Sequence, residues 1–389
     1  MISAKTLCVV VNKPQSALAP SETFLRAHMT RLPFPTLSLV GGPGTRRTDL
    51  GSGSFLQSRF LIARAARAVA HRTFVSSVSS QDGRALKRYF RRQRVGVVLA
   101  EYGPTALTVA RACSELNLPL ITHFHGWDAY VLATETAQRD SYQALFDQSA
   151  AIVAVSRHMQ RHLIALGAPA EKTIWNPCGA EPDPTPGDPA TTPPVFLTVG
   201  RAAPKKATVV ALLAFAQVLE KVPSARLELV GEHGDQVTQQ LTRALGIQHA
   251  TTFRGSLTHE QVLDLMRRSR CYVHPSVTAP DGDMEGTPVA VLEGMAAGLP
   301  IVSTRHGGII DVLSNTTAGI LLEEYDVRGT AAAMLEYAHD ATRARRDGLE
   351  GRRLLQASWS MERSLAALSR VIDLASSGDH AGLAAMATA

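Results

Sequence analysis

Short apolar runs alternate with longer amphipathic stretches along most of this 389-residue chain. The short runs are rich in valine, isoleucine and leucine, which is typical of buried parallel strands, and the longer stretches repeat apolar residues at helical spacing. In the first half the predicted strands are 7–11, 37–40, 95–100, 120–124 and 151–155, and the predicted helices are 21–30, 82–93, 105–116, 136–148 and 157–166. This alternation predicts βα units and a parallel sheet.

The alternation stops at residues 176–194, which contain seven prolines and two glycines. Because proline fixes φ and lacks a backbone N–H, no regular element is expected there. The pattern then resumes with strands at 195–199, 226–230, 251–254, 271–274, 300–304 and 319–322, helices at 208–219, 236–245, 259–269, 287–297 and 327–339, and a last helix at 361–375. A second parallel sheet is therefore predicted.

These two series predict an α/β protein with two Rossmann-like domains. We expect an N-terminal domain at 1–177, a Pro-rich linker at 178–194 and a C-terminal domain at 195–359. A helix at 360–376 is expected to pack back on the N-terminal domain, and the small-residue tail at 377–389 to be mobile. Open α/β sheets bind ligands at the carboxyl ends of their strands, so a cleft between two facing sheets is the expected active site.

Composition excludes several classes of protein. With 45% hydrophobic and 19% charged residues, the chain can bury a core and is not intrinsically disordered. Its four cysteines lie far apart, unlike those of a small disulfide-stapled domain, and reduced thiols in a cytoplasmic protein are expected. No uncharged run approaches the roughly 20 apolar residues of a membrane-spanning helix. We therefore expect a protein that is not integral to a membrane.

The net charge of +6 is unevenly divided along the chain. Residues 1–180 carry 21 lysines and arginines against 10 acidic residues, whereas the remainder carries 19 against 24. Much of the excess lies between residues 59 and 94, as Arg59, Arg64, Arg67, Arg72, Arg84, Lys87, Arg88, Arg91, Arg92 and Arg94. One interpretation is a solvated helix face, and another is peripheral contact with anionic lipid or a phosphate-bearing substrate. Nucleic acid is not expected, because aromatic residues are not interleaved.

The residues 199–206, VGRAAPKK, follow the first strand of the second series. Gly200 allows a sharp turn, which places Arg201 and Lys206 above the carboxyl edge of the sheet. Arginine binds a diphosphate through two parallel hydrogen bonds and lysine acts as a point charge, so the segment suits a diphosphate ligand. The alternative is an ordinary strand-end turn with surface cations.

A second segment, EGTPVAVLE, joins a polar loop to a helix that is predicted to begin near Thr287 or Pro288. The amides around Gly286 would then make an anion-accepting helix end. Glu285 precedes the helix and Glu293 lies eight positions later, close to the same face at 3.6 residues per turn. In the alternative interpretation Glu285 is an end charge that complements the helix dipole, and Glu293 is a solvated helix residue.

Together these two segments resemble the retaining glycosyltransferases of family 4, in their exopolysaccharide and colanic-acid branch. The stretches LELVGEHGD, FRGSLTHEQVLDLM and STRHGGIIDVL extend the resemblance. It implies the GT-B fold of two facing Rossmann-like domains, and an enzyme that moves a hexose from a UDP- or GDP-sugar to a hydroxyl acceptor. It also implies that no metal and no other cofactor is required.

The resemblance assigns roles to individual residues. It implies that Glu285 contacts the donor sugar, that Glu293 binds the ribose and that Arg201 and Lys206 hold the diphosphate. Further donor contacts fall on Gly200, Gly286, Thr287, Pro288, Gly307 and Gly308. In the first half, HFHGWDAY resembles the HG-x-D element of the family, so His125 is expected near the reacting end of the donor sugar. Asp128 and Ser21 are candidates for contact with the acceptor or the sugar.

Three patterns of acidic residues and histidines are not interpreted as functional sites. Asp281–Gly282–Asp283 spells a metal-binding DxD, but it lies in the loop before Glu285, and the i, i+4 pair His158 and His162 lacks a third ligand, so no metal site is predicted. His123 is expected to be structural.

The acceptor of the transfer reaction is expected to be a lipid-linked oligosaccharide in surface polysaccharide synthesis, or else a soluble small molecule. A nucleotide-sugar epimerase and a non-catalytic sugar-nucleotide or glycan binder remain alternatives.

Overall fold

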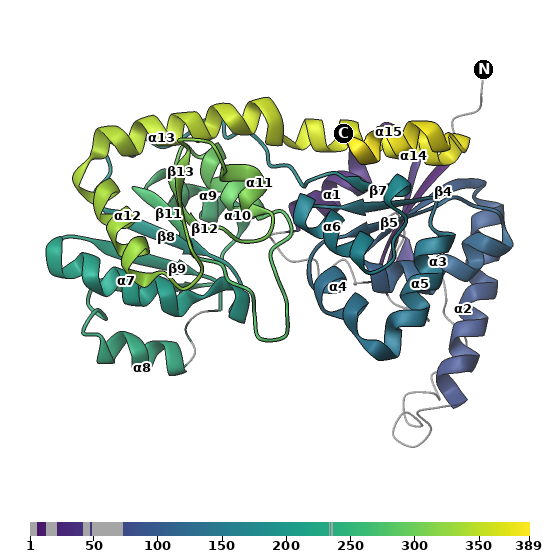
Figure 1. Ribbon diagram of the computed structural model, residues 1–389, viewed down its shortest axis with the longest axis horizontal. Helices are drawn as coiled ribbons and strands as arrows, with labels where there is room; N and C mark the ends of the chain where they lie inside the picture. Colours follow the sequence, from purple (N-terminus) through teal and green to yellow (C-terminus); the bar gives the residue numbers. More distant parts are fainter. Residues whose placement is uncertain (1–5, 13–21, 42–46, 49–72, 233, 235) are drawn as a thin grey trace. The chain divides into compact units, whose positions relative to one another are not determined.

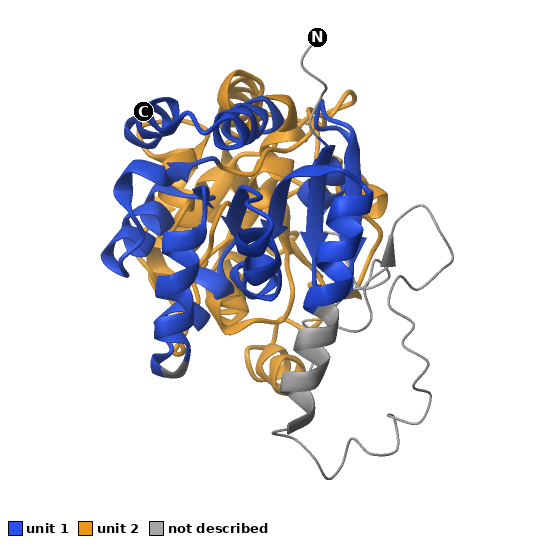
Figure 2. Ribbon diagram, turned by 90° about the vertical axis from the view of Figure 1, so that its right-hand side faces the viewer, with its two compact units in different colours: residues 1–176, 365–389 blue, residues 177–364 orange. Residues whose placement is uncertain are grey.

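The computed structural model describes residues 6–12, 22–41, 47–48, 73–232, 234 and 236–389. The chain divides into two compact units, which Figure 2 distinguishes by colour. Unit 1 contains residues 1–176 together with 365–389, and unit 2 contains residues 177–364. Each unit is built around its own sheet, as the two series of predicted strands require.

Unit 1 contains a seven-stranded sheet in the order β3-β2-β1-β4-β5-β6-β7. The strands are β1 (Thr6–Val11), β2 (Thr36–Val40), β3 (Arg47–Thr48), β4 (Val95–Glu101), β5 (Leu120–Phe124), β6 (Ala151–Ala154) and β7 (Thr173–Trp175). All neighbours pair in parallel except β2 and β3. The five predicted strands are confirmed, whereas the short edge strands β3 and β7 were not predicted.

The helices of unit 1 connect these strands in turn. Their α-helical elements are α1 (Thr23–Thr30), α2 (Thr73–Arg92), α3 (Gly103–Glu115), α4 (Trp127–Tyr130), α5 (Arg139–Gln148) and α6 (Arg157–Ala165), with 3₁₀ turns η4 (Leu132–Thr134), η5 (Thr136–Gln138) and η6 (Ala170–Lys172). Ser156 caps α6 by accepting a hydrogen bond from the Met159 amide, and Pro104 lies in the first turn of α3, where its missing N–H is not needed.

Unit 2 contains a six-stranded, all-parallel sheet in the order β10-β9-β8-β11-β12-β13. The strands are β8 (Val195–Val199), β9 (Arg226–Val230), β10 (Thr251–Gly255), β11 (Cys271–His274), β12 (Ile301–Thr304) and β13 (Gly319–Leu322). Because every strand runs the same way, all six carboxyl ends lie at one edge of the sheet. That edge carries the candidate site.

The helices of unit 2 cover both faces of this sheet. They are η7 (Pro204–Lys206), α7 (Thr208–Lys221), α8 (Gln236–Ala244), α9 (His259–Arg267), α10 (Val289–Ala296), α11 (Ile309–Leu313), α12 (Val327–His339) and α13 (Ala341–Leu354). Helices α7 and α12 lie side by side (Figure 1) and enclose a core of Phe196, Phe215, Met334 and Tyr337 with the sheet. Burial of such side chains contributes about 1.5–3 kcal/mol each.

The Pro-rich segment forms no helix or strand, as predicted, but it is not a free linker. Its residues belong to unit 2. Asp183 is buried there and accepts two hydrogen bonds from Arg267 of α9, at 2.8 and 2.9 Å. Such a bidentate pair holds the chain in one geometry. The sequence pattern identified the loss of regular structure but not the anchoring contact.

The chain ends in helices, which corrects the prediction of a mobile tail. A π-helical turn η8 (Leu355–Trp359) leads to α14 (Met361–Ser377), and α15 (His380–Thr388) follows. Asp379 caps α15 through the Gly382 amide, Leu383 is buried, and the Gln160 side chain donates to the Ala387 carbonyl at 3.0 Å. The alanines that suggested a tail are strong helix formers, and buried Leu383 and Ala387 together with the Gln160 hydrogen bond dock the helix. Within the described residues, no helix has the length and apolar character needed to cross a membrane.

Candidate functional site

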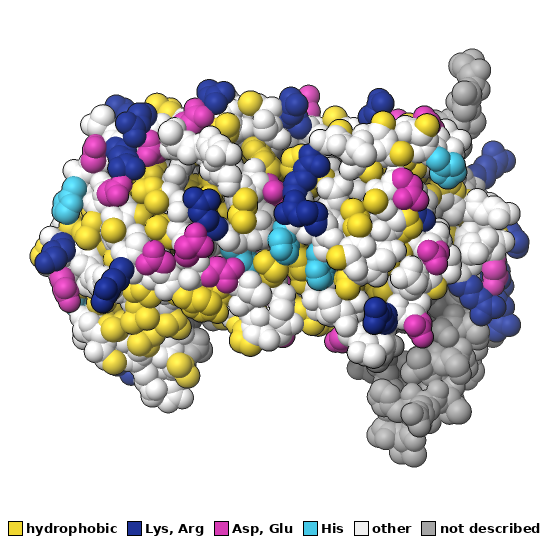
Figure 3. Space-filling model, in the orientation of Figure 1, with side chains coloured by type: hydrophobic (Ala, Val, Ile, Leu, Met, Phe, Trp, Pro, Cys, Tyr) yellow, Lys and Arg dark blue, Asp and Glu magenta, His cyan; other side chains and the backbone are white. Residues whose placement is uncertain are grey.

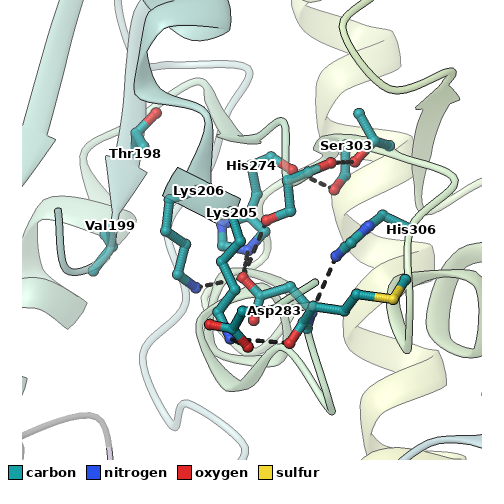
Figure 4. A network of polar contacts seen from close by, with 12 residues as sticks. Thr198, Val199, Lys205, Lys206, His274, Asp283, Ser303 and His306 are labelled. Carbon is teal, nitrogen blue, oxygen red and sulfur yellow. Dashed lines mark hydrogen bonds and ion pairs between the residues drawn. The ribbon is translucent and has the colours of Figure 1, made fainter. Parts of the chain in front are cut away.

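The loop after β8 places two lysines at the carboxyl edge of the unit 2 sheet. Lys206 ends the turn η7, and its Nζ lies 2.7 Å from Oε1 of Glu285. A Cβ on Gly200 would lie 3.3 Å from the Lys206 side chain, so glycine keeps this approach open. Figure 4 shows Lys205 and Lys206 leaving the turn side by side and reaching toward the polar network.

Glu285 is buried and surrounded by donors. Its Oε1 also accepts a hydrogen bond from Ser276 Oγ at 3.1 Å and lies 3.4 Å from His274 Nε2. Burial alone would raise the pKa of Glu285, but the ammonium groups of Lys206 and Lys205 and the His274 ring lower it well below its usual range. The carboxylate is therefore ionised and held in one orientation.

Lys205, which the sequence analysis did not select, fixes the loop before Glu285. Its buried Nζ donates to Asp283 Oδ1 at 3.0 Å and to the Met284 carbonyl at 2.9 Å. The Asp283 carboxylate is therefore already paired with an ammonium group, which does not favour its use as a metal ligand. The two lysines have different contacts. Lys205 holds the loop before Glu285, and Lys206 contacts the Glu285 carboxylate directly.

The glycine turn after β12 closes on the backbone of Glu285. Gly307 has φ of 45°, and a Cβ there would lie 2.4 Å from the Glu285 carbonyl oxygen. The Glu285 amide donates to His306 Nε2 at 3.0 Å, so the proton of that ring sits on Nδ1, which lies 2.6 Å from Glu324 Oε1. In Figure 4, Lys206 and His306 approach this segment from opposite sides. The Gly308 amide also points to the Glu285 carbonyl, at 3.4 Å.

Helix α10 begins at Val289, slightly later than predicted, so Gly286, Thr287 and Pro288 precede it. Gly286 and Pro288 are buried, and Thr287 Oγ1 accepts from the Cys178 amide at 3.0 Å. Glu285 is therefore not on the helix, and the argument from two helical turns does not apply to it. Both glutamates nevertheless act on the same buried hydroxyl, since after burial itself, the largest cause, each raises the pKa of Tyr272.

Glu293 differs from Glu285 in its electrostatics. It is 7% exposed, and burial raises its pKa to about 8. Its Oε1 lies 3.5 Å from His259 Nδ1. The interpretation of Glu293 as a solvated helix residue is therefore wrong. A carboxyl group that burial keeps protonated near neutral pH is a strained feature and is typical of functional sites.

Arg201 stands apart from this network. Its side chain is exposed, and among the described residues it has no hydrogen bond or ion pair. It follows β8 and Gly200 directly, so it emerges at the same edge of the sheet as Lys206. The structure brings Lys206, Glu285 and Gly307 together and leaves Arg201 at the surface, available to a ligand.

Unit 1 brings a second group together at the carboxyl ends of β4 and β5. His125 directly follows β5, and its Nε2 lies 2.7 Å from Oε2 of Glu101, the last residue of β4. Glu101 was not predicted, although a carboxylate that ends a parallel strand is a recognisable signal. His28 of α1 also contacts Glu101, and no pattern in the sequence pointed to it.

Asp128 shapes the backbone around His125. Its Oδ1 accepts from the His125 and Gly126 amides at 3.1 and 2.9 Å, and its Oδ2 accepts from the Gly103 amide at 3.0 Å. These bonds give Asp128 a positioning role within unit 1. Ser21, the other candidate on this side, lies outside the described residues, as do Arg59, Arg64, Arg67 and Arg72.

The two histidines that were set aside as metal ligands have ordinary partners. His158 Nδ1 lies 3.0 Å from the Tyr130 hydroxyl, and His162 Nε2 lies 3.2 Å from the Ala129 carbonyl. These contacts agree with a structural role for both rings.

Comparison with known proteins matches both halves of the chain. The profile of the family described as Glycosyl transferases group 1 matches residues 181–353, and that described as Glycosyltransferase Family 4 matches residues 54–183. The first match contains the whole Lys206–Glu285 network, and the second contains Glu101, His125 and Asp128.

Two curated relatives are named for polysaccharide synthesis. The amylovoran biosynthesis glycosyltransferase AmsK of Erwinia amylovora is 33% identical over 221 residues, 55% of this chain and 54% of AmsK. WcaL of Escherichia coli K12, named as a colanic acid biosynthesis glycosyltransferase, is 29% identical over 251 residues, 63% of this chain and 62% of WcaL. The aligned region thus spans somewhat over half the length of these relatives.

Solved structures show the fold. The Anabaena protein HepE, in a complex with UDP and glucose, superposes with a TM-score of 0.69 over 95% of this chain and 99% of HepE, at 15% identity. The sucrose-phosphate synthase of Thermosynechococcus elongatus gives 0.68 over 94% and 97%, at 16% identity. The fold prediction is confirmed by two Rossmann-like sheets and these neighbours. The chain thus carries a Glycosyltransferase Family 4 domain at residues 54–183 and a Glycosyl transferases group 1 domain at residues 181–353, and its fold is GT-B.

Proposed function

We propose that this protein is a retaining hexosyltransferase that moves a hexose from a UDP- or GDP-sugar to a hydroxyl acceptor. The observation that carries the proposal is the network at the carboxyl edge of unit 2, in which Lys206 and the Gly307 turn hold an ionised, buried Glu285. Such an edge is where Rossmann-like sheets bind nucleotides.

Each part of the donor would meet a different group of this edge. Lys206 and the exposed Arg201 would bind the diphosphate, together with backbone amides of the Gly307–Gly308 turn and of the segment before α10. Glu285 would accept hydrogen bonds from the sugar hydroxyls, and Glu293 from the ribose. His125 of unit 1 would contact the sugar near its reacting carbon.

The reaction breaks the bond between the anomeric carbon and the diphosphate oxygen, and forms a bond from that carbon to the acceptor oxygen. The leaving diphosphate takes up negative charge, which Lys206, Arg201 and helix-end amides would stabilise. We propose attack on the same face as the leaving group, with the departing phosphate oxygen taking the acceptor proton. Asp283 is paired with Lys205, which supports a reaction that needs no metal held by the Asp281–Asp283 loop.

The acceptor is proposed to be a lipid-linked oligosaccharide in surface polysaccharide synthesis, because AmsK and WcaL are named for such pathways. The basic face of unit 1 agrees with this proposal. Arg84, Arg88, Arg91, Arg92 and Arg94 are exposed along the second half of α2 and just after it, and Figure 3 shows Lys and Arg side chains gathered in this region. This surface would contact anionic lipid at the membrane.

The experiment is a nucleoside-diphosphate release assay with UDP- and GDP-hexoses, each with and without lipid-linked acceptor and with and without EDTA. Acceptor-dependent release of one nucleotide, unaffected by EDTA, and a product with the donor's anomeric configuration by NMR are expected. Donor consumption without acceptor would indicate an epimerase instead, and tight nucleotide binding without turnover a non-catalytic binder. Loss of activity in EDTA, restored by a divalent ion, would overturn the metal-free mechanism.

The membrane surface needs its own test. Flotation with vesicles of anionic and of neutral phospholipid compares the wild type with the variant R88A/R91A/R92A/R94A. Binding to anionic vesicles that falls in the variant supports peripheral contact. Equal binding by both proteins would leave these arginines as a solvated helix face.

A further inference from the structure

Glu101 is the centre of a buried cluster that joins three imidazole rings. Its side chain has no exposed surface, and it lies at the end of β4. Oε1 lies 2.7 Å from His28 Nδ1, and Oε2 lies 2.7 Å from His125 Nε2 and 3.2 Å from His123 Nδ1. The rings come from two other elements, α1 and the end of β5, so one carboxylate ties three segments of unit 1 together.

The chemistry of the carboxylate decides where the protons sit. Burial would raise the pKa of Glu101, but His28 and the hydrogen bond to His125 lower it well below its usual range, so the group is ionised. An ionised carboxylate can only accept hydrogen bonds. The 2.7 Å contacts therefore require a proton on His28 Nδ1 and a proton on His125 Nε2.

His123 is the neutral member of the cluster. Burial, the largest cause, and the neighbouring His125 lower the pKa of His123 to about 4. The other titratable groups near the His125 ring and the cluster are Tyr102, whose hydroxyl donates to Glu22 at 2.6 Å, and Asp128, which accepts from backbone amides.

Packing fixes the plane of the His125 ring, while Glu101 determines which ring nitrogen carries the proton. Phe24 stacks on the ring with centroids 4.6 Å apart, and Tyr102 lies against it at 4.7 Å. Aromatic neighbours restrict rotation but do not select a tautomer. A carboxylate hydrogen-bonded to one ring nitrogen does select it, and also stabilises the imidazolium form.

We propose that Glu101 is a positioning residue of the transfer reaction. One of its carboxylate oxygens holds His125 with the proton on Nε2, and His28 holds Glu101 in place through the other oxygen. The inference rests on the proposed function for the role of His125. It goes beyond that function by assigning a task to Glu101 and His28. An ionised carboxylate without exposed surface is costly to a fold, and a task at the site accounts for its presence.

The test compares E101Q with the wild type, with E101D and with E115Q as a matched control. E101Q keeps the shape of the side chain but removes its charge and one acceptor oxygen. A fall in kcat of at least about 100-fold is expected, with the donor KM within a factor of about two, because general acid–base and positioning effects of this kind act on the chemical step. E101D should recover part of kcat, and E115Q, outside the cluster on α3, should match the wild type. Equal kcat in E101Q and the wild type would overturn the proposal.

A second measurement does not depend on activity. In protein labelled with ring-¹⁵N histidine, the two nitrogens of His125 should show the Nε2–H tautomer in the wild type and a mixture in E101Q. If the tautomer is the same in E101Q and the wild type, the inference is overturned even when the enzyme is active. If the tautomer changes but the protein shows no turnover, the proposed function has failed and the proton placement has not.

Metal analysis of the purified protein is a further test, because the ligand atoms of His28, Glu101 and His123 all lie within 4.8 Å of one another. One equivalent of zinc that E101Q loses would make the cluster a metal site and overturn the hydrogen-bonded arrangement.

Discussion

Nζ of Lys206 lies 2.7 Å from Oε1 of Glu285, and the two side chains are 17% and 8% exposed. The cation expected to bind the diphosphate is thus already paired with the carboxylate expected to bind the sugar. In the absence of donor each charge stabilises the other. Lys206 therefore has a role in folding as well as the proposed role in catalysis, and Arg201 does not share it.

Lys206→Ala should lower both activity and stability. Removal of one partner of a buried pair leaves an uncompensated charge and costs about 3 kcal/mol, the low end of the usual range because Lys205 and His274 also face Glu285. Urea unfolding of the wild type and the variant measures this loss. The double variant K206M/E285Q, which removes both charges, should regain most of the stability but none of the transferase activity. Equal stability of wild type and K206A would contradict the role of the pair in folding.

Arg201→Ala should lower activity and leave stability unchanged, because the exposed side chain has no partner within the described part of the chain. Loss of one charge-assisted phosphate contact of about 1.5–3 kcal/mol predicts a fall in kcat/KM of roughly 10- to 150-fold. R201K, which keeps the charge but not the planar fork, should lie between the two. The control is R243A, an exposed arginine on α8, and a similar loss in both variants would argue against a specific contact.

The two neighbouring lysines show how far the sequence could lead. VGRAAPKK identified a cationic loop at a strand end, and strands such as β5 and β8 have the predicted bounds because buried parallel strands are largely apolar runs. Which lysine faces which carboxylate is decided by the single turn η7. Lys205 reaches Asp283 and Lys206 reaches Glu285, a difference that residue type does not encode.

The unit 1 cluster marks the other limit. His125 was predicted from a motif, whereas Glu101 and His28 lie 24 and 97 positions away from it in sequence and meet it only through the order β4-β5 and the placement of α1. The same reason explains α15, whose docking depends on Gln160 of a distant helix. Contacts between elements need the tertiary structure, since local patterns carry information mainly about the elements themselves.

Gly307→Ala should disturb Glu285 more than an ordinary glycine substitution would. The new Cβ would lie 2.4 Å from the Glu285 carbonyl oxygen, in a backbone with φ of 45°. The left-handed conformation alone costs about 1–2 kcal/mol. Gly246→Ala is the matched control, because its φ is also positive, at 70°, but nothing lies within 4 Å of its Cβ. Thermal unfolding should show a larger loss for G307A, and equal losses would mean that the turn can relax away from Glu285.

Glu293 should make stability depend on pH. Burial raises its pKa from 4.5 to about 8, so between these values the folded state binds more protons than the unfolded state. The free energy of unfolding should therefore fall as pH rises from 4.5 to 8 and change no further above it, by about 1.4 kcal/mol for each unit of the difference, or a few kcal/mol in all.

The variant E293Q tests this dependence because it copies the neutral acid and cannot ionise. Its Tm should be close to that of the wild type near pH 5 and exceed it by roughly 10–20 °C at pH 8.5, since 1 kcal/mol corresponds to about 2–4 °C in domains of this size. The pH effects of all other groups are common to both proteins and cancel in the difference. If Glu293 accepts hydrogen bonds from the ribose, nucleoside-diphosphate affinity of the wild type should also rise between pH 7 and 8.5, as the carboxylate forms, and that of E293Q should not. Parallel Tm curves for the two proteins would show that Glu293 is already ionised at neutral pH. A buried carboxylate would then require a compensating cation, either one that binds with the donor or one that lies closer than His259.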